Sequence, residues 1–252
     1  MLITKISAQR RQGRYNIFLD NKYAFSASEK TVAEFVLLKG KELNAEEVEE
    51  IRQFDADAKA SDLAAHYLSY EPRTIFEVLQ YLKKHDISDE AANNAVGQLN
   101  ELGYLDDVQY AKLFIKNDLQ IGTDGPKNLL RKLTQKGVDP AIGQNELTEV
   151  SDADWILVGN RIVKSLLNQI GKISRRELER KMRTKLLTHG FNSEISNEVL
   201  SALEIEEDED IQNEALRKQG IKAYKRFRRF DEAERKFKIK KYLYGHGFSS
   251  SE

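Results

Sequence analysis

The chain has 252 residues, with 40 Lys or Arg against 41 Asp or Glu, and it contains no cysteine. The lack of cysteine excludes disulfide frameworks and thiolate metal sites, and no apolar run has the length of a membrane span or the form of a signal peptide. A hydrophobic content of 40% with three prolines is typical of a helix-rich protein with real cores. We therefore expect a cytoplasmic protein that has no membrane partner.

The first residues predict a small β-rich domain. Apolar and polar residues alternate along residues 15–19, except at Phe18, and again from Tyr23, and the Asp20-Asn21 pair between them suits a tight hairpin turn. Residues 2–6 can add a third strand.

Two helices are expected after this hairpin. Ser28 can cap a helix that ends at Gly40. Asn44, with Glu47 three residues later, is the pattern of a capping box that opens the next helix. We assign residues 1–53 to this β-rich domain and its helix.

A short phrase then recurs four times along the chain. It consists of an apolar stretch, a small turn and a capping residue, and it occupies residues 84–88, 135–139, 188–192 and 245–249. The turn positions are separated by 51, 53 and 57 residues. Such a period is the mark of an array of small units, each too small to bury its apolar face alone.

Each phrase predicts the end of one helix and the start of the next. Glycine, which readily adopts positive φ, holds the turn position in three phrases, and Asp86 holds it in the first. Ser, Asp or Asn two residues later can cap the following helix. With one more helix before each phrase, the repeats have three helices. They are predicted at residues 54–106, 107–150, 151–205 and 206–252, the last without its third helix.

The predicted fold is thus mainly α, with tandem three-helix repeats in an elongated array behind the β-rich domain. Asp86 is expected to alter its turn but not the fold.

Charge is unevenly distributed along this array. Residues 217–241 contain twelve basic and three acidic residues, and residues 161–185 contain nine basic and two acidic residues. Acidic residues are concentrated in residues 42–57 and 204–210. This asymmetry favours a basic surface that meets a polyanion or an acidic protein groove. The alternative is an ordinary solvated helix surface.

Aromatic and basic residues alternate in residues 223–230, a pattern suited to phosphate contacts beside stacked rings. The alternative is an amphipathic helix whose Ile221, Tyr224, Phe227 and Phe230 face the core. Both can hold at once, because the basic residues then occupy the other face.

The sequence shows no catalytic constellation. Three of the four histidines, His85, His189 and His246, precede the repeat turns, which favours an interaction with helix C-termini over metal binding. Asp106 or Asp107 is expected to cap a helix rather than to act as an acid or base. We expect no enzymatic activity and no cofactor.

The first repeat and the N-terminal residues resemble a known family. The segments that carry the resemblance are Leu68-Ser69-Tyr70, Arg73-Thr74, Glu77, Leu99, Leu102-Gly103-Tyr104-Leu105-Asp106-Asp107, Tyr110-Ala111, Ile3-Thr4-Lys5-Ile6, Asn16-Ile17-Phe18-Leu19-Asp20 and Lys22-Tyr23-Ala24-Phe25-Ser26. They are similar to the RecX regulators of bacterial RecA recombinase, in the longer form found in low-GC Gram-positive bacteria. Asp86 departs from the usual glycine of that family.

The resemblance implies a modulator that lies in the groove of the RecA filament on single-stranded DNA. Such proteins restrain filament growth, ATP hydrolysis and strand exchange, and some bind DNA directly. We expect a monomer whose filament or DNA contacts are basic residues of the third and fourth repeats. They are Arg175, Arg176, Arg180, Lys181, Arg226, Arg228, Arg229, Arg235, Lys236 and Lys240.

Two other classes remain open. Three-helix units also occur in free-standing nucleic-acid-binding proteins, which strong sequence-specific binding to a short duplex would indicate. A modular scaffold for another protein is the second alternative, which binding that ignores both RecA and DNA would indicate.

Overall fold

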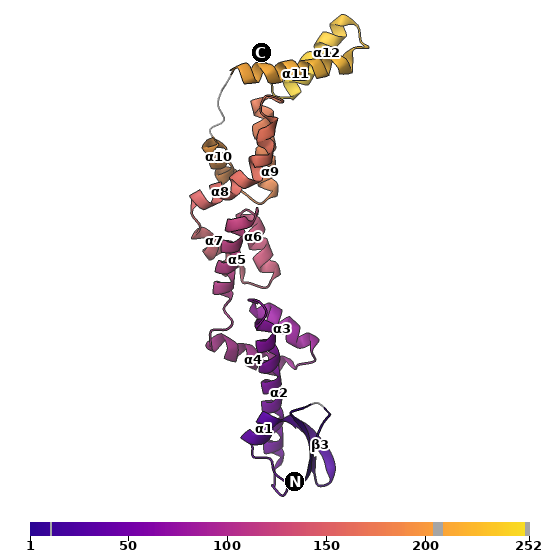
Figure 1. The fold of residues 1–252 in the computed structure, drawn as a ribbon, viewed down its shortest axis with the longest axis vertical. Helices are drawn as coiled ribbons and strands as arrows, with labels where there is room; N and C mark the ends of the chain where they lie inside the picture. Colours follow the sequence, from indigo (N-terminus) through magenta and orange to yellow (C-terminus); the bar gives the residue numbers. More distant parts are fainter. Residues whose placement is uncertain (11, 204–208, 250–252) are drawn as a thin grey trace. The chain divides into compact units, whose positions relative to one another are not determined.

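The computed structural model describes residues 1–10, 12–203 and 209–249. The chain divides into two compact units. Figure 1 shows the ribbon coloured from the N-terminus to the C-terminus. Unit 1 comprises residues 1–110 with 136–138, and unit 2 comprises residues 111–135 with 139–252. The finer division into five domains stays a prediction.

Unit 1 begins with a three-stranded antiparallel sheet in the order β1 (Ile3–Ala8), β2 (Arg14–Leu19) and β3 (Lys22–Ser28). Between β2 and β3, Asp20 and Asn21 have φ values of 46° and 67°. Two consecutive positive φ values match the twist of a two-residue hairpin. The predicted hairpin and third strand are confirmed.

The sheet is followed by α1 (Glu29–Glu34), which is shorter than predicted. Ser28 caps it as expected, since the Ser28 hydroxyl oxygen accepts from the Thr31 N–H at 3.2 Å. The predicted end at Gly40 is wrong, because the chain leaves the helical conformation near Val36, whose φ is 44°.

The long helix α2 (Ala45–Leu68) opens with the predicted Asn44–Glu47 capping box. It runs unbroken through residues 53 and 54, where a domain boundary was predicted. Its first half packs on the sheet and its second half joins the core of the first repeat.

A buried carboxylate ties the sheet to α2. Asp55, which is 6% exposed, accepts hydrogen bonds from Arg14 Nη2 at 2.8 Å, the Ser28 N–H at 2.6 Å and Thr31 Oγ1 at 2.8 Å. Burial opposes ionisation, but these three donors outweigh it and hold the pKa of Asp55 below its usual value. Asp55 therefore joins β2, β3 and α1 to one point of α2.

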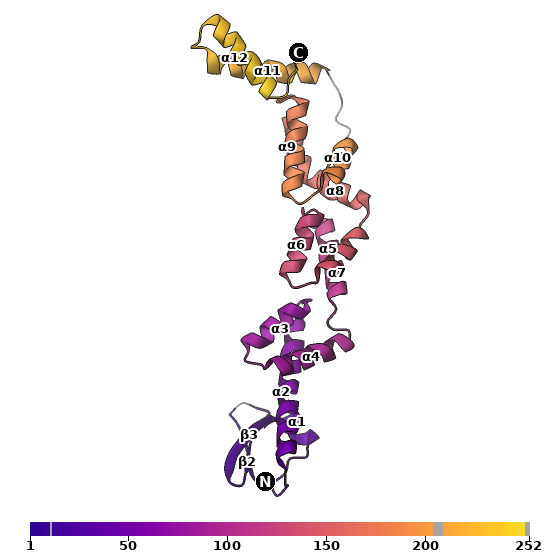
Figure 2. The ribbon, with the colours of Figure 1, turned by 180° about the vertical axis from the view of Figure 1, so that it is seen from behind.

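The first repeat contains the second half of α2 with α3 (Ile75–Lys84) and α4 (Asp89–Glu101) (Figure 2). Thr74 and Ser88 cap α3 and α4. Val78 and Leu82 of α3, which are four residues apart, are fully buried in the core of this repeat.

The remaining helices follow the repeat pattern as predicted. The second repeat has α5 (Asp107–Ile121), α6 (Pro126–Gln135) and α7 (Pro140–Thr148). The third has α8 (Asp152–Val163), which continues as a 3-10 helix η1 (Lys164–Gln169), then α9 (Arg175–Thr188) and α10 (Ser193–Ala202). The fourth has α11 (Glu209–Phe227) and α12 (Glu232–Gly245). Most of the acidic run at 204–210 lies outside the described residues.

Each turn after the first docks on the start of the second helix of the preceding repeat. Thr74 Oγ1, at the start of α3, donates to the Lys136 carbonyl at 2.6 Å within unit 1. In unit 2 the Gly125 N–H, before α6, donates to the His189 carbonyl at 2.7 Å, and Ser174 Oγ, before α9, donates to the His246 carbonyl. The carbonyl of the residue before the turn glycine is the acceptor each time.

This docking explains the turn glycines. A Cβ on Gly190 would lie 2.7 Å from the Asn128 backbone nitrogen, and a Cβ on Gly247 would lie 2.7 Å from Ser174 Oγ. Both glycines also have positive φ, 93° and 86°.

The first turn differs because a sheet domain, not a repeat, precedes it. Asp86 is exposed there with a φ of 57°. The Asp86 N–H donates to the Lys83 carbonyl and the Ile87 N–H to the Leu82 carbonyl, as at the Gly190 and Gly247 turns. Asp86 leaves the fold intact, as expected, but its turn keeps the hydrogen bonds of the Gly190 and Gly247 turns and is not altered in that respect.

Candidate nucleic-acid interface

The ten predicted contact residues lie in two parts of unit 2. Four belong to α9, and six belong to α11, α12 and the connection between them. The two parts differ in how far neighbouring acidic groups neutralise the positive charge.

Helix α9 has one buried and one basic side. Ser174 caps its start, and every fourth residue, Leu178, Met182 and Leu186, is buried at 2% exposure or less. This places the predicted basic residues on the outer side, where Arg176 and Arg180 are exposed.

Two glutamates of α9 pair with its basic residues. Arg175 Nε lies 2.9 Å from Glu179 Oε1, and Lys181 Nζ lies 3.5 Å from Glu177 Oε1. Arg180 Nη2 lies 3.9 Å from the same Glu177 oxygen. The charge of this predicted group is thus partly compensated.

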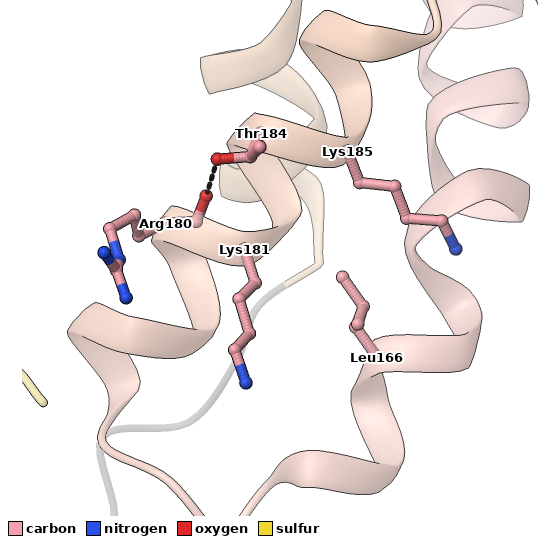
Figure 3. A pocket seen from close by; sticks show the side chains of 5 residues that line it. All are labelled: Leu166, Arg180, Lys181, Thr184 and Lys185. Carbon is pink, nitrogen blue, oxygen red and sulfur yellow. Dashed lines mark hydrogen bonds between the residues drawn. The ribbon is translucent and has the colours of Figure 1, made fainter.

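A surface pocket of about 290 Å³ lies between α9 and η1 (Figure 3). Its lining residues are Leu166, Arg180, Lys181, Thr184 and Lys185. Lys181 Nζ donates to Gln169 Oε1 at 3.0 Å and also lies 3.5 Å from Glu177 Oε1, whereas Lys185 Nζ donates to Ser165 Oγ at 2.8 Å. An anion such as a phosphate can replace the two neutral acceptors, Gln169 and Ser165, since a charged acceptor forms a stronger hydrogen bond than a neutral one.

The α11–α12 hairpin carries charge that is less compensated. Among the described residues, no acidic side chain lies within ion-pair distance of four exposed members of the predicted set. These are Arg228, Arg229, Lys236 and Lys240. Arg226 and Arg235 contact aromatic rings instead.

Three of the four apolar residues expected on a core-facing side of α11 are exposed. Ile221 is 50% exposed and Tyr224 54%, and Phe230, just after α11, is 38% exposed. The residues that α11 buries are Ala215, Gln219 and Ala223. The alternative that all four apolar residues face the core is therefore wrong for Ile221, Tyr224 and Phe230, whereas Phe227 is half-buried and its ring contacts those of Phe230 and Tyr242. In α12, Phe237 is also exposed.

Basic side chains lie over these rings. Arg235 Cζ is 5.1 Å from the ring centre of Tyr224, and Lys238 Nζ is 4.3 Å from that of Phe230. The ring centre of Phe227 lies 6.2 Å from those of both Phe230 and Tyr242, and Tyr224 lies three residues before Phe227 on α11. We call Tyr224, Phe227, Phe230 and Tyr242 the aromatic layer.

The helix-end positions predicted for the three histidines and the cap predicted at Asp106 are confirmed. His85, His189 and His246 are helix C-cap residues. Asp106 Oδ1 accepts from the backbone N–H groups at the start of α5. Asp107 accepts from the Ile75 N–H at 3.0 Å, and burial, with the charges of Asp106 and Glu77, raises the pKa of Asp107.

In the described part of the chain, no three His, Asp or Glu side chains are grouped closely enough to hold a metal ion. No helix in that part has the length and apolar character needed to span a membrane.

Three residues of these surfaces were missed by sequence reasoning. Lys185 lies one helical turn after the predicted Lys181, Lys238 lies one turn before Tyr242, and Tyr242 is the fourth ring of the aromatic layer. The four-residue spacing is visible in the sequence, but the partners across the hairpin depend on how α11 and α12 pack.

Three family models match parts of the chain. The regulatory protein RecX N-terminal domain matches residues 1–44, the first RecX three-helix domain residues 60–99, and the third RecX three-helix domain residues 210–252. The matches cover the sheet, the first repeat and the α11–α12 hairpin.

Whole-chain comparisons agree with these matches. The chain is 57% identical over 251 residues to regulatory protein RecX of Lactobacillus delbrueckii, covering 100% of this chain and 93% of the relative. It is 34% identical to regulatory protein RecX of Bacillus subtilis, covering 98% and 94%. A crystal structure of regulatory protein RecX aligns with a TM-score of 0.64 at 30% identity, over 79% of this chain and 98% of the other. RecX from Lactobacillus salivarius aligns with a TM-score of 0.58 at 28% identity, over 60% and 99%.

Proposed function

Because the chain belongs to the RecX family of regulatory proteins, we propose that it is a non-catalytic regulator of RecA recombinase. It lies in the groove of a RecA filament on single-stranded DNA and restrains ATP hydrolysis, filament extension and strand exchange. It acts in the cytoplasm as a monomer.

One observation supports this proposal above the others: four exposed basic residues of the α11–α12 hairpin have no acidic partner among the described residues. Uncompensated positive charge on a chain with a net charge of −1 is suited to a polyanion or to an acidic protein groove.

The basic pocket of α9 adds a second contact region in unit 2. Lys181 and Lys185 each donate to a neutral acceptor that an anion can replace, and Lys181 also lies 3.5 Å from Glu177 Oε1. Contacts that are individually weak gain avidity when one chain carries several of them and its partner repeats along an axis. A filament of identical protomers on DNA is such a partner.

The test measures RecA ATP hydrolysis on single-stranded DNA while this protein is added below the RecA concentration. Wild type should inhibit at substoichiometric ratios. A variant with Arg228, Arg229, Lys236 and Lys240 changed to Glu should lose the inhibition, and circular dichroism should show unchanged helicity.

The matched control reverses four exposed lysines elsewhere, namely Lys83, Lys84, Lys112 and Lys116. This change alters the net charge by the same amount, so inhibition should persist if position matters. Full inhibition by the hairpin variant would overturn the assigned contact surface. No inhibition by wild type at any ratio would overturn the function itself.

A further inference from the structure

We propose that the aromatic layer of the α11–α12 hairpin is a stacking site for unpaired nucleobases, so that the fourth repeat distinguishes single-stranded from duplex DNA without RecA. The inference rests on the proposed function for its choice of single-stranded DNA as ligand. It assigns to Tyr224 and Phe230 a role in specificity that phosphate contacts alone cannot provide.

The first step is the exposure of the rings. Tyr224 and Phe230 are 54% and 38% exposed although each is large and largely apolar. The face that α11 buries consists of the small residues Ala215 and Ala223 with Gln219, so the rings are not needed to pack this helix. Every base has a π face, so an exposed aromatic ring binds unpaired bases with little regard to sequence.

The second step concerns what lies over the rings. Arg235 lies over Tyr224 and Lys238 over Phe230, an interaction that is weak at exposed sites. Lys238 Nζ also lies 3.3 Å from Glu234 Oε1. Bases and cations compete for the same ring face. When a strand binds, each cation can move to a phosphate oxygen while a base takes its place on the ring.

The third step is the surrounding charge. Residues 217–241 contain twelve basic residues and three acidic ones, and these basic residues can follow a phosphate backbone past the rings. A duplex offers the same phosphates, but its bases are stacked inside. The rings therefore favour a single strand.

The test uses the full chain without RecA, a fluorescent 20-nucleotide oligothymidylate, and an abasic oligomer of the same length and charge. Wild type should bind the thymidylate more tightly than the abasic strand. Tyr224→Leu should weaken thymidylate binding roughly tenfold, within the range of one stacked base, and should leave abasic binding and the salt dependence unchanged. Tyr224→Phe should retain wild-type binding.

Tyr244→Leu is the matched control, since Tyr244 lies on α12, is 72% exposed and is outside the aromatic layer. It should bind like wild type. Equal affinity of wild type for the thymidylate and abasic strands, or an equal loss of both with Tyr224→Leu, would overturn the inference. Loss of RecA inhibition is measured separately, so failure of the stacking site and failure of the proposed function give different results.

Discussion

The docking of the repeat turns makes a quantitative prediction for Gly190→Ala. The alanine would keep a φ of 93°, and its Cβ would lie 2.7 Å from the Asn128 backbone nitrogen. Left-handed backbone costs a non-glycine residue about 1–2 kcal/mol, and an overpacked site costs about 1–3 kcal/mol more. We expect Gly190→Ala to lower the free energy of unfolding by about 2–5 kcal/mol.

Gly103→Ala separates the two contributions. Gly103 has a φ of 75°, but a Cβ there would meet nothing within 4 Å. This variant should lose only the backbone contribution. Urea unfolding monitored by circular dichroism should therefore give Gly103→Ala a clearly higher free energy of unfolding than Gly190→Ala.

Amide hydrogen exchange gives a local measurement for the same variant. The Gly125 and Lys127 N–H groups donate to the His189 and Gly190 carbonyls, and both should exchange faster in Gly190→Ala. If Gly190→Ala is no less stable than Gly103→Ala and leaves these amides protected, the docking argument is wrong.

Two further predictions concern unit 1. Asp55→Asn removes the partner of Arg14 in a buried ion pair and should cost about 3 kcal/mol at pH 7. The pKa of Asp55 is lowered in the folded state, so the ionised carboxylate stabilises the fold at a pH above its unfolded pKa near 3.8. This stabilisation is lost as the pH falls through the folded pKa. The difference in free energy of unfolding between wild type and Asp55→Asn, measured with urea, should therefore be smaller at pH 3 than at pH 7. Thr74→Val removes both the cap of α3 and the hydrogen bond to the Lys136 carbonyl, and a loss of about 1–2 kcal/mol is expected. An unchanged urea midpoint for Thr74→Val would contradict the role given to that hydroxyl.

Local signals in the sequence predicted the elements well. The hairpin at Asp20-Asn21 and the Asn44 capping box depend on residues close together in the chain, as do the helix ends at His85, His189 and His246, and all are confirmed. Turn and cap chemistry needs few long-range contacts, so it can be predicted from sequence.

The wrong predictions concern features that tertiary packing determines. The spacing of Ile221, Tyr224 and Phe230 is that of a buried helix face, yet α11 packs through Ala215 and Ala223. Periodicity identifies a possible apolar face but does not say that another element covers it. The end of α1 was misplaced because Val36 adopts a positive φ that is rare for a β-branched residue.

The sequence predicted which basic residues form the candidate interface, but not which acidic residues pair with them. The sequence contains Glu177 and Glu179 beside the arginines of α9, but only the structure shows which acid pairs with which base. It also separates the compensated residues of α9 from the uncompensated ones of the hairpin, such as Arg228 and Lys240.

The docked turns make the repeats non-interchangeable. Gly190 and Gly247 each fit against the repeat before them, whereas Asp86 follows a sheet domain and has a side chain where a docked turn has none. In a shuffled chain, the first repeat placed behind another would bring its aspartate against a helix start and would require Asp86→Gly to be accommodated. A duplicated third repeat already carries glycine at its turn, so it can dock on the repeat before it without a substitution. The array can therefore be lengthened more readily by copying the third repeat than by copying the first.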